Sequence, residues 1–105
     1  MGLDVILIIG IIMKVLASEI IIRLVDVHSL KEKRSIRESL IRKVQNKFKI
    51  SIAECDSQDD LNFLTIGFAA VSNSNTHLNS VNENVIHFIE TNFGLDIVSK
   101  ETYWL

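Results

Sequence analysis

The fold class is decided by residues 18–56, SEIIIRLVDVHSLKEKRSIRESLIRKVQNKFKISIAECD. Residues 18–26 alternate in apolar character, with Ile20, Ile22 and Leu24 on one face, which predicts a half-buried strand. Ser29 stands three residues before Glu32, the spacing of a capping box at the start of a helix. Residues 49–56 alternate again, so this stretch predicts a strand, a helix and a second strand in succession.

The predicted helix has one apolar side. At about 100° per residue, one arc contains most of its apolar side chains: Leu30, Ile36, Leu40, Ile41, Val44 and Phe48. Arg37 also enters this arc, which leaves two interpretations open. Its head reaches outward and enlarges the basic surface of the helix, or it pairs with an acidic partner.

The rest of the chain predicts a second unit of the same kind. A polar turn, SQDD at 57–60, precedes a predicted strand over 62–72. A second helix then begins among the N-cap candidates of SNSNT at 72–76 and ends at Gly94, before a final strand over 95–104. The order βαββαβ predicts a ferredoxin-like α+β fold, a four-stranded antiparallel sheet with two helices on one face, over residues 13–105.

The first twelve residues are set apart from this domain. Residues 5–13, VILIIGIIM, form the longest apolar run, but nine residues are too few for a membrane-spanning helix, which needs about 20. No basic region precedes the run, so neither an anchor nor a secretion signal is predicted. Residues 1–12 are either an extra strand or an extension that precedes a start at Met13.

Composition excludes several classes of protein. With 48% hydrophobic residues, four glycines and no proline, the chain is globular, which excludes collagen and long disordered tracts. One cysteine cannot form an internal disulfide, so we expect a cytoplasmic protein. Three scattered histidines give no zinc spacing, and we predict no metal and no cofactor.

Charge is distributed very unevenly. Residues 31–49 carry eight basic and two acidic side chains, a net charge of +6, whereas the other 86 residues carry three basic and eleven acidic, a net charge of −8. A basic helix of this kind predicts contacts to RNA phosphates, and the candidates are Lys31, Lys33, Arg34, Arg37, Arg42 and Lys43. The alternative is a solvated face, in which Glu38 partly neutralises Arg34 and Arg42.

A second candidate site depends on the topology. We expect the first and third strands to lie side by side and parallel, which would bring both helix N-termini to one edge of the sheet. Free amides there favour an anion, and the candidate residues are His28, Ser29, Ser72, Asn73 and His77. The alternative is that these side chains only cap helices and stabilise turns.

Two other features are predicted to be structural. The acidic side chains near the second turn form a solvated turn at the opposite sheet edge from the histidines: Glu54, Asp56, Asp59 and Asp60. Cys55 is predicted to be packed rather than reactive.

The face of the sheet opposite the helices is predicted to be apolar. It carries Ile21, Val25, Phe63, Ala69 and Val71, which favours association with a protein or with a second copy of the chain. Base stacking of the RNA-recognition kind is not expected, because Ala70 occupies an aromatic position of that motif and Phe68 faces the helices.

Three segments resemble a known family: HSLKEKR at 28–34, FKISIAECDSQD at 48–59 and IGFAAVSN at 66–73. In this order they are similar to the YlxP-like family of small bacterial proteins, and the similarity runs from Met13 to Leu105. The resemblance implies a ferredoxin-like fold, no established reaction and an aliphatic residue at position 37. It marks, without assigned roles, His28, Ser29, Lys31, Lys33, Arg34, Glu54, Asp56, Gln58, Asp59, Ser72 and Asn73.

Genes of that family often lie beside those for translation initiation factor two and ribosome-binding factor A. The resemblance therefore implies ribosomal RNA or the small ribosomal subunit as a partner. Our first hypothesis is a non-catalytic module that docks on structured RNA through the basic helix 31–49. The alternative is a homodimerising or protein-interaction module that uses the open sheet face.

Overall fold

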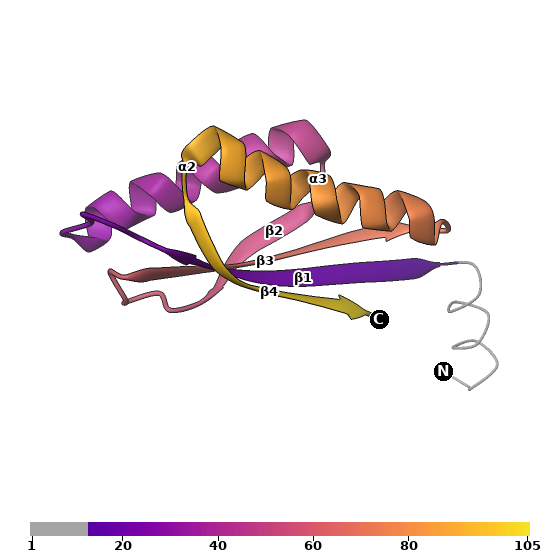
Figure 1. Ribbon diagram of the computed structural model, residues 1–105, viewed down its shortest axis with the longest axis horizontal. Helices are drawn as coiled ribbons and strands as arrows, with labels where there is room; N and C mark the ends of the chain where they lie inside the picture. Colours follow the sequence, from indigo (N-terminus) through magenta and orange to yellow (C-terminus); the bar gives the residue numbers. More distant parts are fainter. Residues whose placement is uncertain (1–12) are drawn as a thin grey trace.

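The computed structural model describes residues 13–105, so both predictions for residues 1–12 lie outside the described part of the chain. Its elements are β1 (Lys14–Arg23), α2 (Leu30–Phe48), β2 (Ser51–Asp56), β3 (Phe63–Ser72), α3 (Asn75–Phe93) and β4 (Asp96–Trp104). The strands form one sheet in the order β2-β3-β1-β4, and both helices cover the same face (Figure 1). The predicted ferredoxin-like α+β fold is confirmed.

Every pair of neighbouring strands is antiparallel. Along β1 and β3, Lys14 lies opposite Ser72 and Arg23 lies opposite Phe63. The prediction that the first and third strands run parallel is therefore wrong. In the split βαβ arrangement each crossover helix joins two parallel strands that are not neighbours, and the strand between them runs the other way.

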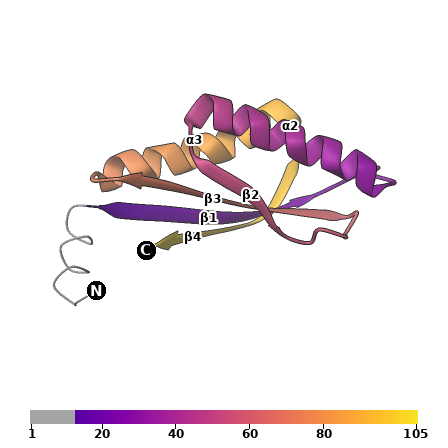
Figure 2. The ribbon, with the colours of Figure 1, turned by 180° about the vertical axis from the view of Figure 1, so that it is seen from behind.

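Strand β1 is the centre of the sheet and begins earlier than predicted. It pairs with β3 from Lys14 onward and with β4 from Leu16 onward. Backbone pairing on both sides extends the strand towards Lys14, beyond the predicted start at residue 18. Its two partners also place the start of β1 and the end of β4 at the same end of the sheet, as Figure 2 shows from behind.

The core lies between the sheet and the two helices. Alternate residues of β1 and β3 point into it, as predicted, and they meet the apolar stripes of α2 and α3. Its fully buried members include Ile20, Ile22, Leu40, Val44, Leu64, Ile66, Val85 and Ile89. The one buried hydroxyl of β1, Ser18, is hydrogen-bonded to Asn82 of α3 and Thr102 of β4, so its burial leaves no polar group unpaired.

The helix ends follow the predicted capping pattern. The Ser29 hydroxyl accepts the Glu32 N–H at 3.1 Å, and the Glu32 carboxylate accepts the His28 N–H at 3.0 Å. Ser74 caps α3 by accepting the His77 N–H, and Gly94 ends that helix with φ of +58°. None of the helices within residues 13–105 is long and apolar enough to cross a membrane.

Candidate functional site

The two helix N-termini lie at opposite ends of the sheet. His28 and Ser29 follow the Arg23 end of β1, whereas Ser72 lies at the Lys14 end, together with Asn73 and His77. The antiparallel pairing of β1 and β3 thus separates the five residues predicted to form one anion site. The hydroxyls of Ser29, Ser72 and Ser74 each accept a local backbone N–H, which agrees with the capping alternative.

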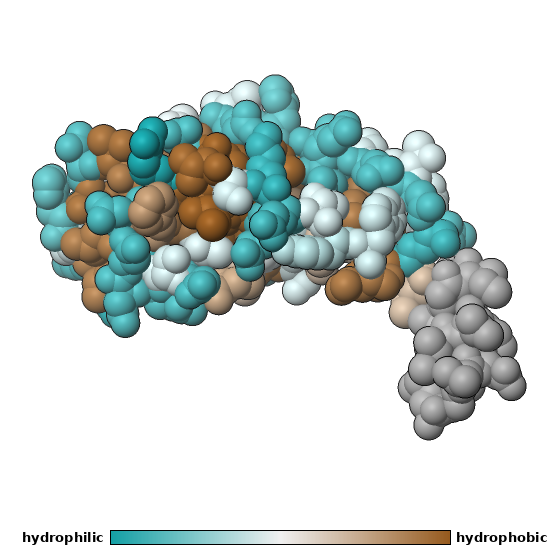
Figure 3. Space-filling model, turned by 60° about the horizontal axis from the view of Figure 1, so that its bottom comes forward, coloured by the Kyte–Doolittle hydropathy of each residue, from teal (hydrophilic) through white to brown (hydrophobic). Residues whose placement is uncertain are grey.

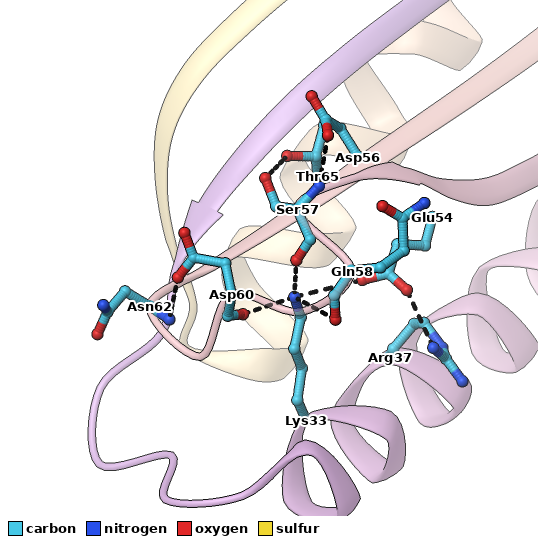
Figure 4. A network of polar contacts seen from close by, with 9 residues as sticks. All are labelled: Lys33, Arg37, Glu54, Asp56, Ser57, Gln58, Asp60, Asn62 and Thr65. Atoms are coloured by element: carbon cyan, nitrogen blue, oxygen red, sulfur yellow. Dashed lines mark hydrogen bonds and ion pairs between the residues drawn. The ribbon is translucent and has the colours of Figure 1, made fainter.

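A buried ionic cluster holds the β2–β3 turn against the start of α2 (Figure 4). The Lys33 side chain is only 2% exposed, and its ammonium lies 3.4 Å from the Glu54 carboxylate. The ammonium donates to the backbone carbonyl oxygens of Ser57, of Gln58 at 3.5 Å and of Asp60 at 2.7 Å. An ammonium has three donors, and these three carbonyls use all of them, so its contact with Glu54 Oε2 is an ion pair without a hydrogen bond. We call this group, with Arg37, the Lys33 cluster.

Glu54 is the acidic partner of both basic side chains in this cluster. Its side chain is 7% exposed, and its Oε1 accepts a hydrogen bond from Arg37 at 2.9 Å. Of the two interpretations that the sequence left open for Arg37, this contact supports the pair with an acidic partner, because the side chain reaches inward to a carboxylate. A carboxylate this buried needs cationic partners, since taking an unpaired charge out of water costs several kcal/mol.

The Lys33 cluster corrects three predictions. Lys33 is enclosed and fully bonded, so it does not present a charge to RNA phosphates. Glu54 lies in the interior rather than in a solvated turn. The turn over 57–60 lies beside α2, at the same end of the sheet as His28, because β1 and β2 run in the same direction.

A signal in the sequence could have found this cluster. Lys33 stands seven residues before Leu40 and eleven before Val44, so it falls in the middle of the apolar arc of the helix. Glu54 stands two residues after Ile52, so the strand period points it toward the helices. A cation and a carboxylate on facing buried surfaces predict an ion pair.

The outer side of α2 carries cations of a different kind. Lys31, Arg34 and Arg42 are exposed, and none of them forms an ion pair with an acidic group of residues 13–105. Glu38, which the sequence placed between Arg34 and Arg42, instead contacts Arg37 at 3.4 Å. We call Lys31, Arg34 and Arg42 the outer basic face of α2.

Lys43 lies on the side of α2 that faces α3. Its ammonium is 5.3 Å from the centre of the Phe93 ring, and Lys47 lies 4.9 Å from the centre of the Phe88 ring. Such cation–π contacts hold the side chains along the helix pair. Of the six predicted RNA contacts, three thus form the outer basic face, while Lys33, Arg37 and Lys43 have other partners.

The acidic side chains of the β2–β3 turn bond to the turn itself. The Asp56 carboxylate accepts the Ser57 N–H at 2.7 Å, and the Asp60 carboxylate accepts the Asn62 N–H at 2.8 Å. Within residues 13–105, no three His, Cys, Asp or Glu side chains are grouped so that they could hold a metal ion.

The open face of the sheet contains a shallow groove of about 360 Å³. Small residues form its base, and Cys55 and Tyr103 lie among its walls. The small residues are Ala17, Ala53, Gly67 and Ala69. Cys55 is exposed here, so the prediction that it is packed is wrong. Figure 3 turns this side of the molecule forward and shows apolar side chains gathered between polar ones. We call this feature the open-face groove.

Tyr103 provides a pH-dependent probe of the open-face groove, because it is the sole tyrosine in the sequence. Its hydroxyl donates to the Glu101 carboxylate. This hydrogen bond, together with the negative charges of Glu101 and Glu19, raises the pKa of Tyr103 above 10.0. We predict that Glu101→Gln lowers this pKa, measured by ultraviolet absorbance during a base titration. Glu90→Gln, on the other side of the sheet, should leave the pKa unchanged, and an equal change in both variants would contradict the assignment.

Comparison with known proteins identifies the family. The family model described as "Protein of unknown function (DUF503)" matches residues 15–102. The chain is also 35% identical over 79 residues to "Uncharacterized protein YlxP" of Bacillus subtilis (strain 168). This match covers 75% of the chain and 86% of that protein. The chain therefore belongs to the YlxP-like (DUF503) family, whose function is unknown.

Proposed function

We propose that this chain is a non-catalytic module that docks on structured RNA through the outer basic face of α2. The observation that carries the proposal is the set of three exposed cations without acidic partners in residues 13–105. The resemblance described above makes the small ribosomal subunit the first RNA target to test.

The spacing of these cations suits a run of phosphates. Lys31 and Arg42 are eleven residues apart in one straight helix, which corresponds to about 17 Å along its axis. Lysine provides a point charge, and each arginine can bind two phosphate oxygens with its planar head. The three side chains can therefore contact several phosphates of one RNA surface at once.

The charge of the rest of the molecule supports a contact limited to this face. Outside residues 31–49 the chain has a net charge of −8, which repels a polyanion from the other surfaces. Lys33 and Arg37 share the carboxylate of Glu54, so they add little to the field outside. Docking should therefore be oriented and strongly dependent on salt.

The test is co-sedimentation of the full chain with small ribosomal subunits at several salt concentrations. A Lys31→Gln/Arg34→Gln/Arg42→Gln variant is compared with the unaltered chain. We expect saturable binding at low salt by the unaltered chain and much weaker, still measurable binding at low salt by the variant. The slope of log affinity against log salt should also become shallower by about 2 to 3, because each lost phosphate contact removes about 0.7 to 0.9.

The matched control changes the three basic residues outside the basic helix. Lys14→Gln/Arg23→Gln/Lys100→Gln alters the net charge by the same amount. Arg23 and Lys100 form only exposed ion pairs, with Asp96 and Glu90, and such pairs contribute little to stability. We expect this control to bind as the unaltered chain does. An equal loss of affinity in both variants would show that binding depends on the net charge of the chain and not on the outer basic face of α2. If the unaltered chain does not bind at low salt, the small ribosomal subunit is excluded as the target.

A further inference from the structure

Two carboxylates lie next to each other on the open face of the sheet. Glu19 of β1 is directly opposite Glu101 of β4 in the pairing register. Like charges in this position repel each other, since their Cβ atoms stand only about 5 Å apart. Within residues 13–105 neither carboxylate forms an ion pair, although Glu101 accepts the hydroxyl of Tyr103. We call Glu19 and Glu101 the carboxylate pair.

The carboxylate pair lies at one end of the open-face groove. The pairing register aligns two rows of residues that cross the sheet from β4 through β1 and β3 to β2. One row is Glu101, Glu19, Gly67 and Ala53, and the other is Tyr103, Ala17, Ala69 and Ser51. The side chains that these rows place on β3 and β2 are all small. The groove therefore combines a shallow trough over β3 and β2 with a negative end over β1 and β4.

The trough has room for an apolar side chain. Ala17 and Ala69 lie side by side in its floor, and neither side chain extends beyond Cβ. The Cys55 sulfur lies above Gly67, because a Cβ built on that glycine would be 2.5 Å from the Cys55 Sγ. The groove of about 360 Å³ can hold one aliphatic side chain, and filling it would remove apolar surface from water on both partners.

Charge indicates which kind of partner complements the groove. The carboxylate pair repels the phosphates of RNA. It also opposes a second copy packed face to face, because the one cation that the described strands place on this face is Arg23, which is already paired with Asp96 at 2.6 Å. A protein segment that carries a cation close to an apolar side chain complements both the negative end and the trough.

The spacing within the groove fits an extended segment. Neighbouring strands are about 4.8 Å apart, so the middle of β3 is about 7 Å from the line midway between β1 and β4. Side chains two residues apart in an extended segment point the same way and also stand about 7 Å apart. A segment that crosses the strands can therefore cover the trough with one side chain and reach the carboxylate pair with the next but one.

We propose that the open-face groove binds an extended segment of a partner protein. The segment places an aliphatic side chain over Gly67 and Ala69 and, two residues further on, an arginine or lysine between the carboxylates of Glu19 and Glu101. This binding is independent of RNA docking, because α2 covers the other face of the sheet (Figure 1).

Cys55 makes weak binding to the groove measurable, because its exposed thiol lines the groove and is the sole thiol in the sequence. The probe is the thiol peptide mercaptopropionyl-Leu-Gly-Arg amide, which forms a disulfide with Cys55 of the folded full chain. Favourable contacts of the attached peptide make this disulfide harder to reduce. The measurement is the concentration of β-mercaptoethanol that releases half of the peptide, followed by mass spectrometry of the intact protein.

Two related peptides separate the charge contact from the apolar contact. Mercaptopropionyl-Leu-Gly-Glu amide reverses the charge, and mercaptopropionyl-Gly-Gly-Arg amide lacks the aliphatic side chain. We expect the Leu-Gly-Arg peptide to withstand about tenfold more β-mercaptoethanol than the Leu-Gly-Glu peptide, because arginine meets two opposite charges where glutamate meets two like charges. It should withstand about fivefold more than the Gly-Gly-Arg peptide, because its leucine is removed from water.

Paired variants locate the charge contact. Glu19→Gln/Glu101→Gln should remove the preference for arginine over glutamate. The matched control, Glu83→Gln/Glu90→Gln, changes the net charge equally at exposed positions of α3 and should keep the preference. Circular dichroism checks that both variants remain folded.

A second thiol tests whether the preferences belong to the groove. Thr76→Cys in a Cys55→Ser chain places the sole thiol on α3, where Thr76 is exposed and its helix neighbours Asn79 and Ser80 carry no charge. We expect the three peptides to be released from this thiol at similar concentrations of β-mercaptoethanol.

Four results would overturn the proposal. Equal release of the three peptides from Cys55 would show that the groove selects neither charge nor apolar character. An arginine preference that persists in folded Glu19→Gln/Glu101→Gln, or that is equally large at Thr76→Cys, would assign it to the overall charge of the chain. A Cys55 thiol that forms no disulfide even with β-mercaptoethanol would show a groove already covered. Reactivity of Cys55 that falls as the protein concentration rises would assign the groove to a second copy.

Discussion

Replacing Lys33 with methionine is expected to lower the free energy of unfolding by about 3 to 5 kcal/mol, the usual cost of removing one partner from a buried ion pair. The substitution leaves Glu54 only 7% exposed, with Arg37 as its single remaining cation. It also removes the donor from the carbonyl oxygens of Ser57 and Asp60. Methionine fills a similar volume, so the loss measures the ionic and hydrogen-bonding groups rather than a cavity.

Part of this loss arises from the β2–β3 turn. Ser57 has φ of +60°, a left-handed conformation that costs a residue with a side chain about 1 to 2 kcal/mol. The bond between the Lys33 ammonium and the Ser57 carbonyl helps to offset that cost. Without it, we expect faster hydrogen exchange in the turn as well as a lower global stability.

Lys31→Met is the matched control, because Lys31 lies on the same helix but is exposed. Its effect on the free energy of unfolding should stay within about 0.5 kcal/mol. Urea unfolding followed by circular dichroism measures both variants. A loss below about 1 kcal/mol for Lys33→Met, or a similar loss in both variants, would show that the Lys33 cluster contributes little net stability.

The second large effect is expected from Ile20→Ala, which should cost about 2 to 5 kcal/mol, as large-to-small changes in a packed core do. Ile20 is fully buried at the centre of β1, between the sheet and both helices. Because the central strand is paired on both sides, its backbone has little freedom to collapse into the space left behind. The cavity should therefore persist.

The neighbouring residue supplies the comparison. Ile21 has the same side chain but points to the open face and is half-buried. We expect Ile21→Ala to cost about 1 kcal/mol, because less apolar surface is returned to water. Thermal or urea unfolding of the two variants gives the difference directly. Equal costs would mean that the open face is covered along β1 as completely as the helix side.

Local features of this fold could be predicted from sequence because each depends on neighbouring residues. Ser29 with Glu32 marked the start of α2, Gly94 marked the end of α3, and the alternation of β1 and β3 separated buried from open faces. The direction of β3 relative to β1 could not be predicted from neighbouring residues. An alternating strand has the same pattern whichever way it runs, so the direction follows only from the path of the connections.

The exposed cations of the candidate site could be predicted from sequence, but the buried ion pair beside them could not be predicted from residue type. The basic character of α2 is plain in the sequence, and Lys31, Arg34 and Arg42 lie on its exposed side as expected. Lys33 belongs to the same run of charges, but its partner Glu54 comes from a strand that packs against it only in the folded chain. Residue type alone therefore favoured solvent, and the interior was indicated only by the helical phase of Lys33 and the strand phase of Glu54.

The central position of β1 has a consequence for how the chain folds during synthesis. β1 is fully paired only after both of its partner strands have been synthesised. The later partner, β4, comes from residues 96–104. Until those residues leave the ribosome, one whole edge of β1 has unpaired N–H and carbonyl groups beside a partly assembled core. Contacts this distant in sequence also slow folding, because a long loop must close before they form. The nascent chain should therefore stay open to proteases until residues 96–104 have left the ribosome, and then become resistant in a single step.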